Sequence, residues 1–374
     1  MDRYTSAGLP VEIVPGPPIA RRFGHDLLRI SRTEQVRILA AEIIPYGAQL
    51  AHRLLAARRN ILHLNTPRAT FLAGIVPRLA GFPVVVHVRG QLGLFGAVQR
   101  EVIANVADRL ILVAHSLMSE FPARHSRKCV TLYNAIDEQA FSSTPGSDPN
   151  ELRFASPETR NATVLCVGAV TPAKGQHRLL EALAILKQRS LPEFKVVILG
   201  DLHNEHYKRH LDQLVERYKL NNVRFAGWAQ YPRDYYEAAD IIVLPTVQQE
   251  TIETAEGTIA VLGGEGLPRA IVEAMYVGKA SVASRLAGVP EMIEDGKSGL
   301  IVSPGSATEL AEALAFLLSN PGERAQMGRE AAARAKLLFS SDRLADGVTE
   351  VYRDLLARRS GSLRGKILGA LNAT

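Results

Sequence analysis

The feature that most constrains the fold is a regular alternation of short β-branched runs with longer stretches of helical periodicity. Runs such as 84–88 (VVVHV) and 195–199 (KVVIL) are apolar over nearly their whole length, which is typical of strands buried on both faces. Strand–helix alternation of this kind predicts parallel sheets covered by helices, an α/β fold. The predicted strands are 11–14, 61–64, 84–88, 110–113, 129–132, 163–167, 195–199, 222–225, 241–244, 280–283 and 300–302, and helical periodicity is clear at 34–58, 175–189, 205–219 and 307–319.

One segment interrupts this alternation. Residues 142–161 are rich in Ser, Pro and Asn and carry no apolar period, which indicates a linker. Since 374 residues are long for one domain, we expect doubly wound domains at 1–145 and 160–335, followed by a C-terminal helix and basic tail at 336–374. Such sheets bind ligands at the carboxyl ends of their strands, so the ligand is expected between the two domains.

Composition places the chain among soluble globular proteins. Hydrophobic residues make up 47% and charged residues 22% of it. No apolar run approaches the ~18 residues that span a bilayer, and the first residues lack the apolar core of a secretory signal. The two cysteines, Cys129 and Cys166, lie in apolar runs, where buried thiols fit better than a disulfide. We therefore expect a cytoplasmic protein.

Positive charge gathers in two segments of a chain whose net charge is +6. Residues 21–60 hold eight arginines against three acidic residues, and the tail adds Arg358, Arg359, Arg364 and Lys366 without an acid. Such segments attract phosphates, which predicts contact with an anionic membrane surface; a solvated face explains the charge equally well. Nucleic acid is not expected as a partner, because no recognition motif accompanies the charge.

The most informative stretch is GGEGLPRAIVEAMY, in which Glu265 precedes Glu273 by eight residues. Pro268 suits the first position of a helix, where its missing N–H costs nothing. The backbone N–H groups of Gly266 and Leu267, together with the positive end of that helix, then form an anion site suited to a diphosphate. A surface helix with an acidic first turn would show the same glutamate spacing.

Two strand ends add further candidates. The strand at 163–167 runs into Gly168, and Lys174 follows at the start of the next helix. A glycine there lets a phosphate approach the backbone, and the lysine supplies a point charge. The strand at 195–199 ends in Gly200, at a sheet edge where ligands bind. An exposed turn lysine and glycines that merely form turns are the alternative interpretation.

These motifs occur in an order and spacing that resemble a known family. Residues 163–310 resemble the donor-binding half of a retaining GT-B glycosyltransferase of the family 4 type (glycosyl transferases group 1), and the first half matches more loosely. The resemblance implies two Rossmann-like domains facing a central cleft, with the C-terminal helix returning towards the first domain. The matching stretches are ILHLN, VVVHVRG, ADRLILVAHSLMSEF, YNAIDEQAF, VGAVTPAKGQHRLLEAL, VVILGD, VRFAGW, AADIIVLPT, EGLPRAIVEAM and AGVPEMIEDGKSGLIVSPG.

The resemblance also implies roles for single residues. Glu265 would lie beside the donor sugar and the reacting centre, and Glu273 would hydrogen-bond the ribose. Gly266 and Leu267 would hold sugar hydroxyls or the diphosphate through their N–H groups, and Lys174 would neutralise the diphosphate as it leaves. Members of the family retain the anomeric configuration and generally need no metal. No cofactor is therefore expected, and the sequence has no Asp-x-Asp or histidine cluster that would hold a metal.

The sequence departs from the family pattern at two site positions. The residue after Gly168 is usually an arginine that pairs with the lysine on the diphosphate, and here it is Ala169. Where the first domain commonly has a histidine near the reacting sugar, this chain has Arg89, with His87 two residues earlier on the same face of the strand. Arg89 cannot act as a base but could hold a phosphate or a carboxylate. A histidine of the core is the alternative interpretation of His87.

Two further departures concern whole segments. The family begins with a strand, a Gly-rich loop and a helix, whereas this sequence starts at what resembles the second strand, so ~30 residues of a βαβ unit are expected to be missing. Between residues 247 and 262 the chain also carries an insertion with Glu250, Glu253 and Glu256 at helix spacing. This insertion fits a lid over the donor, an acceptor-selecting loop or a passive surface element.

The leading hypothesis is an enzyme that transfers a hexose from a nucleotide-sugar donor to a glycan or lipid-linked acceptor in polysaccharide assembly, on the inner face of the membrane. A non-catalytic partner that binds a nucleotide sugar is the alternative, favoured by the missing unit and by Ala169. An NAD-linked dehydrogenase is disfavoured, because no G-x-G-x-x-G follows a strand with an acidic residue ~20 positions on.

Overall fold

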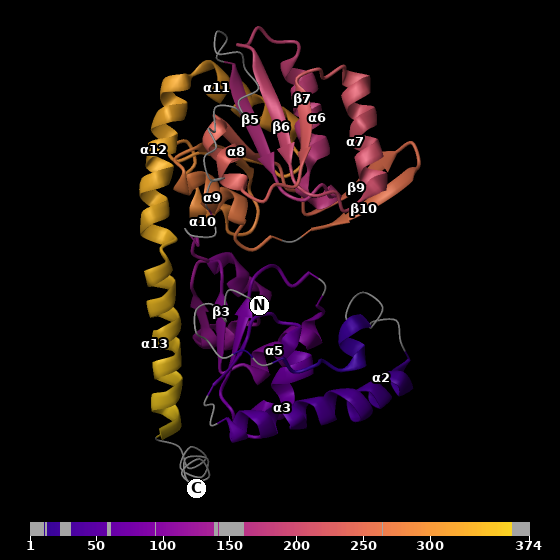
Figure 1. Cartoon of the computed structure of the whole chain (residues 1–374), viewed down its shortest axis with the longest axis vertical. Helices are drawn as coiled ribbons and strands as arrows, with labels where there is room; N and C mark the ends of the chain where they lie inside the picture. Colours follow the sequence, from indigo (N-terminus) through magenta and orange to yellow (C-terminus); the bar gives the residue numbers. More distant parts are fainter. Residues whose placement is uncertain are drawn as a thin grey trace.

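The structure of the chain, a computed structural model, describes residues 11, 13–22, 31–57, 61–93, 95–137, 141, 161–263 and 265–360. It has two halves, each built on a parallel sheet, and the chain passes from one to the other and back (Figure 1). The α/β fold predicted from the alternation is confirmed. The predicted linker at 142–161 lies outside the described residues except for Asn161, so the domain bounds stay a prediction.

The N-terminal half has a four-stranded sheet in the order β1-β2-β3-β4. All five residues of β2 are buried, which explains why that strand is almost purely apolar. Its strands are β1 (Leu62–Leu64), β2 (Val84–Val88), β3 (Arg109–Leu112) and β4 (Cys129–Thr131), and its helices are η1 (Pro18–Arg22), α2 (Arg32–Ile38), η3 (Leu39–Ile43), α3 (Ile44–Ala56), η4 (Thr70–Gly74), α4 (Ile75–Leu79), α5 (Ala97–Val106), η5 (His115–Glu120) and η6 (Ala123–Lys128).

The C-terminal half has a six-stranded parallel sheet in the order β12-β11-β8-β5-β6-β7. The strands of this sheet are β5 (Ala162–Val167), β6 (Phe194–Leu199), β7 (Val223–Gly227), β8 (Ile241–Leu244), β11 (Ala280–Ser284) and β12 (Leu300–Val302). A separate antiparallel pair consists of β9 (Gln249–Thr254) and β10 (Gly257–Leu262). The helices are η8 (Pro172–Lys174), α6 (Gln176–Leu186), α7 (Glu205–Tyr218), α8 (Pro232–Ala238), α9 (Arg269–Tyr276), α10 (Val289–Met292), α11 (Ala307–Ser319), α12 (Pro321–Leu338) and α13 (Ser341–Ser360).

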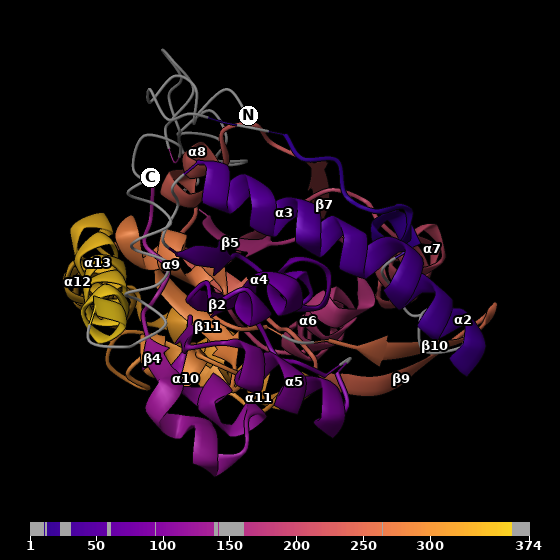
Figure 2. The same ribbon diagram turned by 90° about the horizontal axis from the view of Figure 1, so that it is seen from below.

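The two halves share one hydrophobic core and are braced along one side. A single cluster of buried residues contains Val86 of the first half and Leu267 and Ile271 of the second. Helices α12 and α13 run one after the other along both halves (Figure 1). Seen from below, α3 crosses the outer face of the N-terminal half, and the β9–β10 pair projects on the side away from α13 (Figure 2). Helix α13 packs on the first sheet, where Val351 and Leu355 contact the buried residues of β2 and β3.

Most predicted strands coincide with observed strands to within two residues, and one predicted strand is wrong. Residues 11, 13 and 14 do not form a strand. The insertion at 247–262, whose glutamates are spaced as on a helix, forms a β-hairpin in which Thr and Ile residues alternate faces. In the described part of the chain, no helix is both long and apolar enough to cross a membrane.

We predict that two glycines of α12 respond oppositely to substitution. A Cβ at Gly328 would lie 2.2 Å from the carbonyl oxygen of Gly278, in the turn that α12 packs on, whereas a Cβ at Gly322 would meet nothing within 4 Å. Gly328→Ala should lower the free energy of unfolding by about 1–3 kcal/mol, because backbone has to move to admit the methyl group. Gly322→Ala should leave it unchanged or raise it by up to about 1 kcal/mol. Equal effects in urea titrations would contradict this packing.

Candidate functional site

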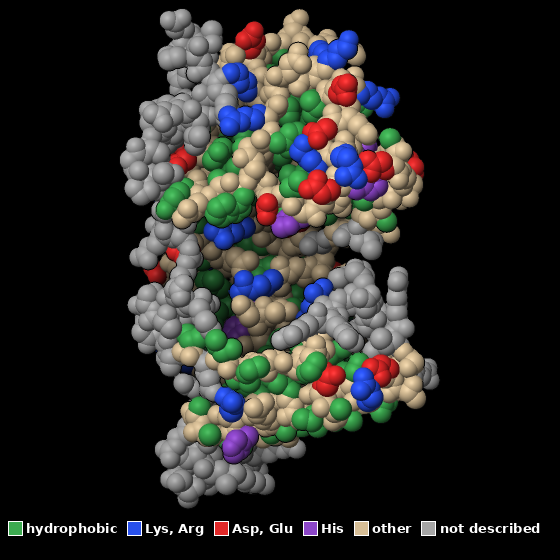
Figure 3. Space-filling view, turned by 45° about the vertical axis from the view of Figure 1, so that its right-hand side comes forward, with side chains coloured by type: hydrophobic (Ala, Val, Ile, Leu, Met, Phe, Trp, Pro, Cys, Tyr) green, Lys and Arg blue, Asp and Glu red, His purple; other side chains and the backbone are tan. Residues whose placement is uncertain are grey.

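The two halves meet backbone to backbone at two glycines. Gly90, just beyond β2, forms an antiparallel bridge with Gly266, just before α9. A Cβ at Gly266 would lie 2.4 Å from the carbonyl oxygen of Arg89, so only glycine permits this approach. The contact places Arg89 and Glu265 on either side of one bridge. Figure 3 shows the surface hollowed between the halves, with Lys, Arg and His side chains around the hollow.

Lys174 ends the short helix η8, between β5 and α6, and its Nζ forms an ion pair with the carboxylate of Glu265. The two side chains are partly exposed, at 28% and 20% of their surface. The next residue, Gly175, adopts φ +68°, and a Cβ there would lie 1.9 Å from the carbonyl oxygen of Pro245. A left-handed residue without a side chain therefore turns the chain into α6 and keeps Lys174 beside the end of β8.

Gly168 and Gly200 lie at the ends of β5 and β6, as the sequence predicts for a ligand-binding edge. They adopt φ +151° and +158°, and a Cβ at Gly200 would lie 2.0 Å from the carbonyl oxygen of Gly168. Lys174 packs its aliphatic chain over Gly168, since a Cβ there would be 3.3 Å from the lysine Cδ. Glycine at both positions lets the two strand ends and the lysine crowd together at one edge.

Glu265 precedes the first residue of α9 by four positions. Pro268 is the residue before the helix, with φ −66° and ψ 114°, so its prediction as the first helical residue is off by one position. Leu267 is 6% exposed and belongs to the shared core, which fixes the turn between Glu265 and α9. The N-terminal end of α9 thus follows Glu265 within four residues, and its helix dipole favours an anion near that end.

Glu273 lies deeper than the other candidates. Its carboxylate accepts a hydrogen bond of 2.6 Å from Nε of Arg269, and the residue is only 5% exposed. Burial and the neighbouring Glu273 carboxylate raise the pKa of Tyr236, on α8, well above its usual value. The described polar neighbours of Glu273 are thus Arg269 and Tyr236, not Lys174 or Glu265.

Arg89 belongs to the N-terminal half and directly precedes Gly90 of the bridge. It is exposed, and its Nη2 and Nε donate to Oδ1 of Asn65 at 2.7 and 3.1 Å. His87 is 5% exposed, and its Nε2 has no hydrogen-bond partner in the described structure. Burial, the positive charge of Arg89 and nearby His63 lower the pKa of His87 to about 4. His87 is therefore neutral near pH 7, which fits a histidine of the core.

Glu291 is a contact that the sequence did not reveal. From α10 of the C-terminal half, its carboxylate accepts hydrogen bonds from the backbone N–H groups of His115 and Ser116, at 2.7 and 2.8 Å, and from the Tyr133 hydroxyl at 3.1 Å. All three donors belong to the N-terminal half, and His115 and Ser116 begin helix η5, so Glu291 caps a helix of the opposite half. The sequence GVPE indicates the turn that contains Glu291, but the residues that Glu291 bonds lie more than 150 positions away in the chain.

Two cationic side chains and one carboxylate lie near the contact between the two halves. Lys174 comes from one half and Arg89 from the other, and Glu265 lies between the lysine and α9. Such an arrangement suits an anion that also carries hydroxyl groups. Among the residues that the structure describes, no group of three or more His, Cys, Asp or Glu side chains could hold a metal ion.

Comparison with known sequences gives a family and relatives. The sequence model of the family "Glycosyl transferases group 1" matches residues 148–334. Spore coat protein SA of Bacillus subtilis is 26% identical over 306 residues, 78% of this chain and 74% of that protein. The amylovoran biosynthesis glycosyltransferase AmsK of Erwinia amylovora is 35% identical over 176 residues, 46% of this chain and only 40% of that protein.

Among solved structures, Anabaena Alr3699/HepE in complex with UDP and glucose superposes with a TM-score of 0.71. The match covers 94% of this chain and 88% of that one, at 23% sequence identity. At this identity the likeness shows a shared fold. It confirms the predicted arrangement of two Rossmann-like domains facing a cleft, the GT-B fold.

We predict that protonation of His87 destabilises the fold in mild acid. The unfolded chain takes up this proton near pH 6.5, while the folded chain resists it until about pH 4, so stability falls as the pH drops between these values. The contribution of His87 should reach about 2 kcal/mol at pH 5. His87→Phe should therefore reduce the fall in Tm between pH 7.5 and pH 5. Burial also lowers the pKa of His63, but His63 titrates in both proteins and does not contribute to the difference between them. Equal falls in Tm for the wild type and the variant would contradict the assignment to His87.

Proposed function

Since the chain belongs to the glycosyl transferases group 1 family, we propose that it moves a hexosyl group from a nucleotide-sugar to a glycan or lipid-linked acceptor in cell-surface polysaccharide biosynthesis. The reaction retains the anomeric configuration and uses neither a metal ion nor another cofactor. Relatives named for the biosynthesis of amylovoran and colanic acid support the polysaccharide role. The solved complexes of Anabaena Alr3699/HepE with UDP-glucose, and with UDP and glucose, support the class of donor.

The observation that carries the proposal is the Lys174–Glu265 pair at the contact between the halves. In the absence of donor the lysine neutralises Glu265. A bound diphosphate competes for the Lys174 ammonium, which frees the Glu265 carboxylate to accept hydrogen bonds from sugar hydroxyls. Donor binding thereby changes the partners of both groups at the reacting centre.

In the proposed reaction the bond between the anomeric carbon and the phosphate oxygen breaks while the acceptor oxygen attacks from the same face. The acceptor proton passes to the departing phosphate oxygen, so no protein base is required. Negative charge grows on the diphosphate in this step, and Lys174, Arg89 and the N-terminal end of α9 stabilise it more in the transition state than in the ground state. The backbone N–H groups of Gly266 and Leu267 complete the anion site, while Gly168, Gly200 and Pro268 shape it.

Ala169 leaves a single cation on the C-terminal side of this site. The carbonyl oxygen of Ala169 accepts a hydrogen bond of 3.0 Å from Gln176 Nε2, so the backbone of this turn is held without an arginine. Arg89, from the opposite half, takes the place of a second cation. If Arg89 does not reach the diphosphate, the alternative function, a non-catalytic nucleotide-sugar-binding partner, follows from the weakened site.

We predict slow release of nucleoside diphosphate from one donor in a panel of UDP-glucose, UDP-galactose, UDP-N-acetylglucosamine and GDP-mannose. Lys174→Ala and Glu265→Ala should each lower this hydrolysis about 100-fold, the order of effect for one group that stabilises transition-state charge. Lys297→Ala is the matched control, because Lys297 pairs with Glu294 in an exposed turn. Binding of a donor without any release, in protein that folds normally, would favour the non-catalytic partner.

We further propose that the basic tail docks on an anionic membrane surface at the inner face of the membrane. Residues 361–374 lie outside the described part of the chain, so this rests on the sequence. The protein should cosediment with vesicles containing phosphatidylserine. Binding should fall by up to about 1000-fold when Arg358, Arg359, Arg364 and Lys366 are changed to glutamine, because each lysine or arginine near the surface contributes about 1 kcal/mol. Equal sedimentation with vesicles of neutral lipid would contradict an electrostatic mode.

A further inference from the structure

The β9–β10 hairpin connects two elements of the site. At its start, the backbone N–H of Val247 donates to the carbonyl oxygen of Ala173, the neighbour of Lys174, at 3.0 Å. At its end, β10 leads within three residues to Glu265. The amide of Gln248, just before β9, donates to Oε1 of Gln91 in the N-terminal half at 2.9 Å. The base of the hairpin therefore lies where the halves meet, next to Lys174.

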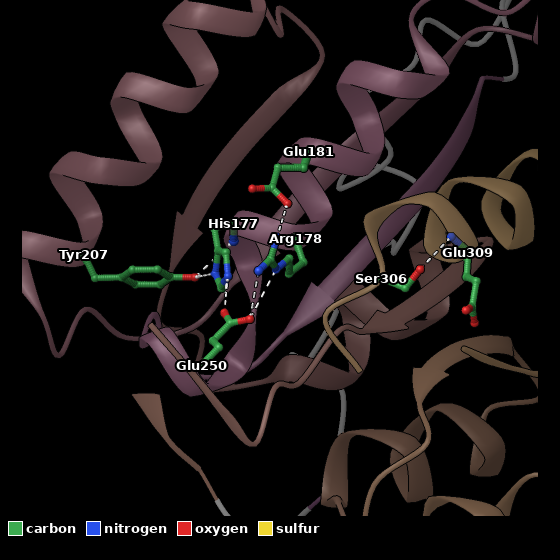
Figure 4. Close-up of polar contacts among 7 residues, drawn as sticks. All are labelled: His177, Arg178, Glu181, Tyr207, Glu250, Ser306 and Glu309. Atoms are coloured by element: carbon green, nitrogen blue, oxygen red, sulfur yellow. Dashed lines mark hydrogen bonds and ion pairs between the residues drawn. The ribbon is translucent and has the colours of Figure 1, made fainter. Parts of the chain in front are cut away.

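The face of the hairpin that points to the C-terminal half is anchored by Glu250. One carboxylate oxygen of Glu250 lies 2.5 Å from Nε2 of His177, and the other lies 3.0 Å from Nη2 of Arg178 (Figure 4). On its far side, Nδ1 of His177 lies 2.8 Å from the Tyr207 hydroxyl. His177 is 2% and Glu250 14% exposed at the side chain. These partners follow Lys174 by three and four residues, so the hairpin is tied to the turn that carries the lysine.

Further contacts hold the hairpin along its length. Ile252 and Val261 are buried in the core of the C-terminal half. At the tip, the Glu256 carboxylate accepts two hydrogen bonds of 2.7 Å from Arg209 of α7. An element fixed at its base, middle and tip is a rigid wall rather than a lid that opens and closes.

The opposite face of the hairpin is polar and has no partner. Because side chains alternate along a strand, Gln249, Thr251 and Glu253 share the face that Glu250 and Ile252 do not. Thr258 lies directly across from Glu253 on β10. All four side chains belong to exposed residues, and none forms a hydrogen bond or ion pair with another described residue. They present amide, hydroxyl and carboxylate groups on a hairpin whose base lies where the halves meet.

We propose that this outer face, formed by Gln249, Thr251, Glu253 and Thr258, binds the acceptor through the hydroxyl groups of a sugar residue. The inference rests on the proposed function. Glu253 is the one charged side chain among these four residues, and residues 247–262 contain no Lys or Arg in a chain of net charge +6, so the face repels a phosphate or an anionic membrane. A neutral ligand rich in hydroxyl groups satisfies its donors and acceptors. The diphosphate is held at Lys174, which leaves this wall to the acceptor.

The test compares acceptor transfer with donor hydrolysis in the full chain. The variant Thr251→Ala/Glu253→Ala removes two outer-face side chains and keeps the anchored face intact. Its matched control is Glu256→Ala, which removes a carboxylate of the same hairpin that points to Arg209. The acceptor probes are the p-nitrophenyl glycosides of glucose, galactose and N-acetylglucosamine, supplied with the donor that the wild-type protein hydrolyses.

The proposal predicts that the double variant raises KM for the accepted glycoside about tenfold or more, as expected for two lost hydrogen bonds. Its kcat and its donor hydrolysis without acceptor should stay within twofold of the wild-type values, and Glu256→Ala should change neither. An unchanged KM, or an equal loss of donor hydrolysis, overturns the proposal while leaving the transferase intact. Absence of both donor hydrolysis and transfer in the wild-type protein overturns the proposed function and this inference with it.

Discussion

The arrangement of the site depends on the close approach of two backbones at Gly90 and Gly266. A side chain at Gly266 would overlap the carbonyl oxygen of Arg89, so this bridge between the halves requires glycine. It brings Arg89, from the end of a strand in one half, to Glu265, from the start of a helix in the other. Glu291 holds the same interface at a second point, by capping η5 of the opposite half. Together with the shared hydrophobic core, these contacts fix how the two halves are oriented.

Around that interface, the geometry of the parallel sheet determines where the other site residues lie. The carboxyl ends of β5, β6 and β8 meet at one edge, and glycines at 168, 175 and 200 let the following loops crowd together there. The crowding places Lys174 over Gly168 and beside Glu265. The hairpin extends this edge outward, since Glu250 ties it to the turn after Lys174. The proposed donor-side charge and the proposed acceptor-side face therefore lie on two connected elements, η8 and the hairpin.

Local signals in the sequence predicted much of this structure. Continuous apolar runs marked the buried strands, and glycines at strand ends with Lys174 and Glu265 marked the edge where the site lies. Local signals failed where tertiary contacts decide. The alternation of Thr and Ile in β9 and β10 was present, but three glutamates at helix spacing obscured it. The partners of Glu291 lie in the other half of the chain, and no local pattern could have assigned them. The run 11–14 has strand-like residues but forms no strand.

The central claim is that a nucleoside diphosphate binds at the contact between the halves, held by Lys174 and the start of α9. A crystal structure of the full chain with UDP bound tests it most directly, with GDP in its place if UDP does not bind. The account predicts the diphosphate within hydrogen-bond distance of Lys174 Nζ and of the backbone at Gly266 or Leu267, with the Gly90–Gly266 bridge intact and Glu265 released from the lysine. A nucleotide bound away from Lys174, or a Lys174–Glu265 pair that persists beside it, would contradict the account.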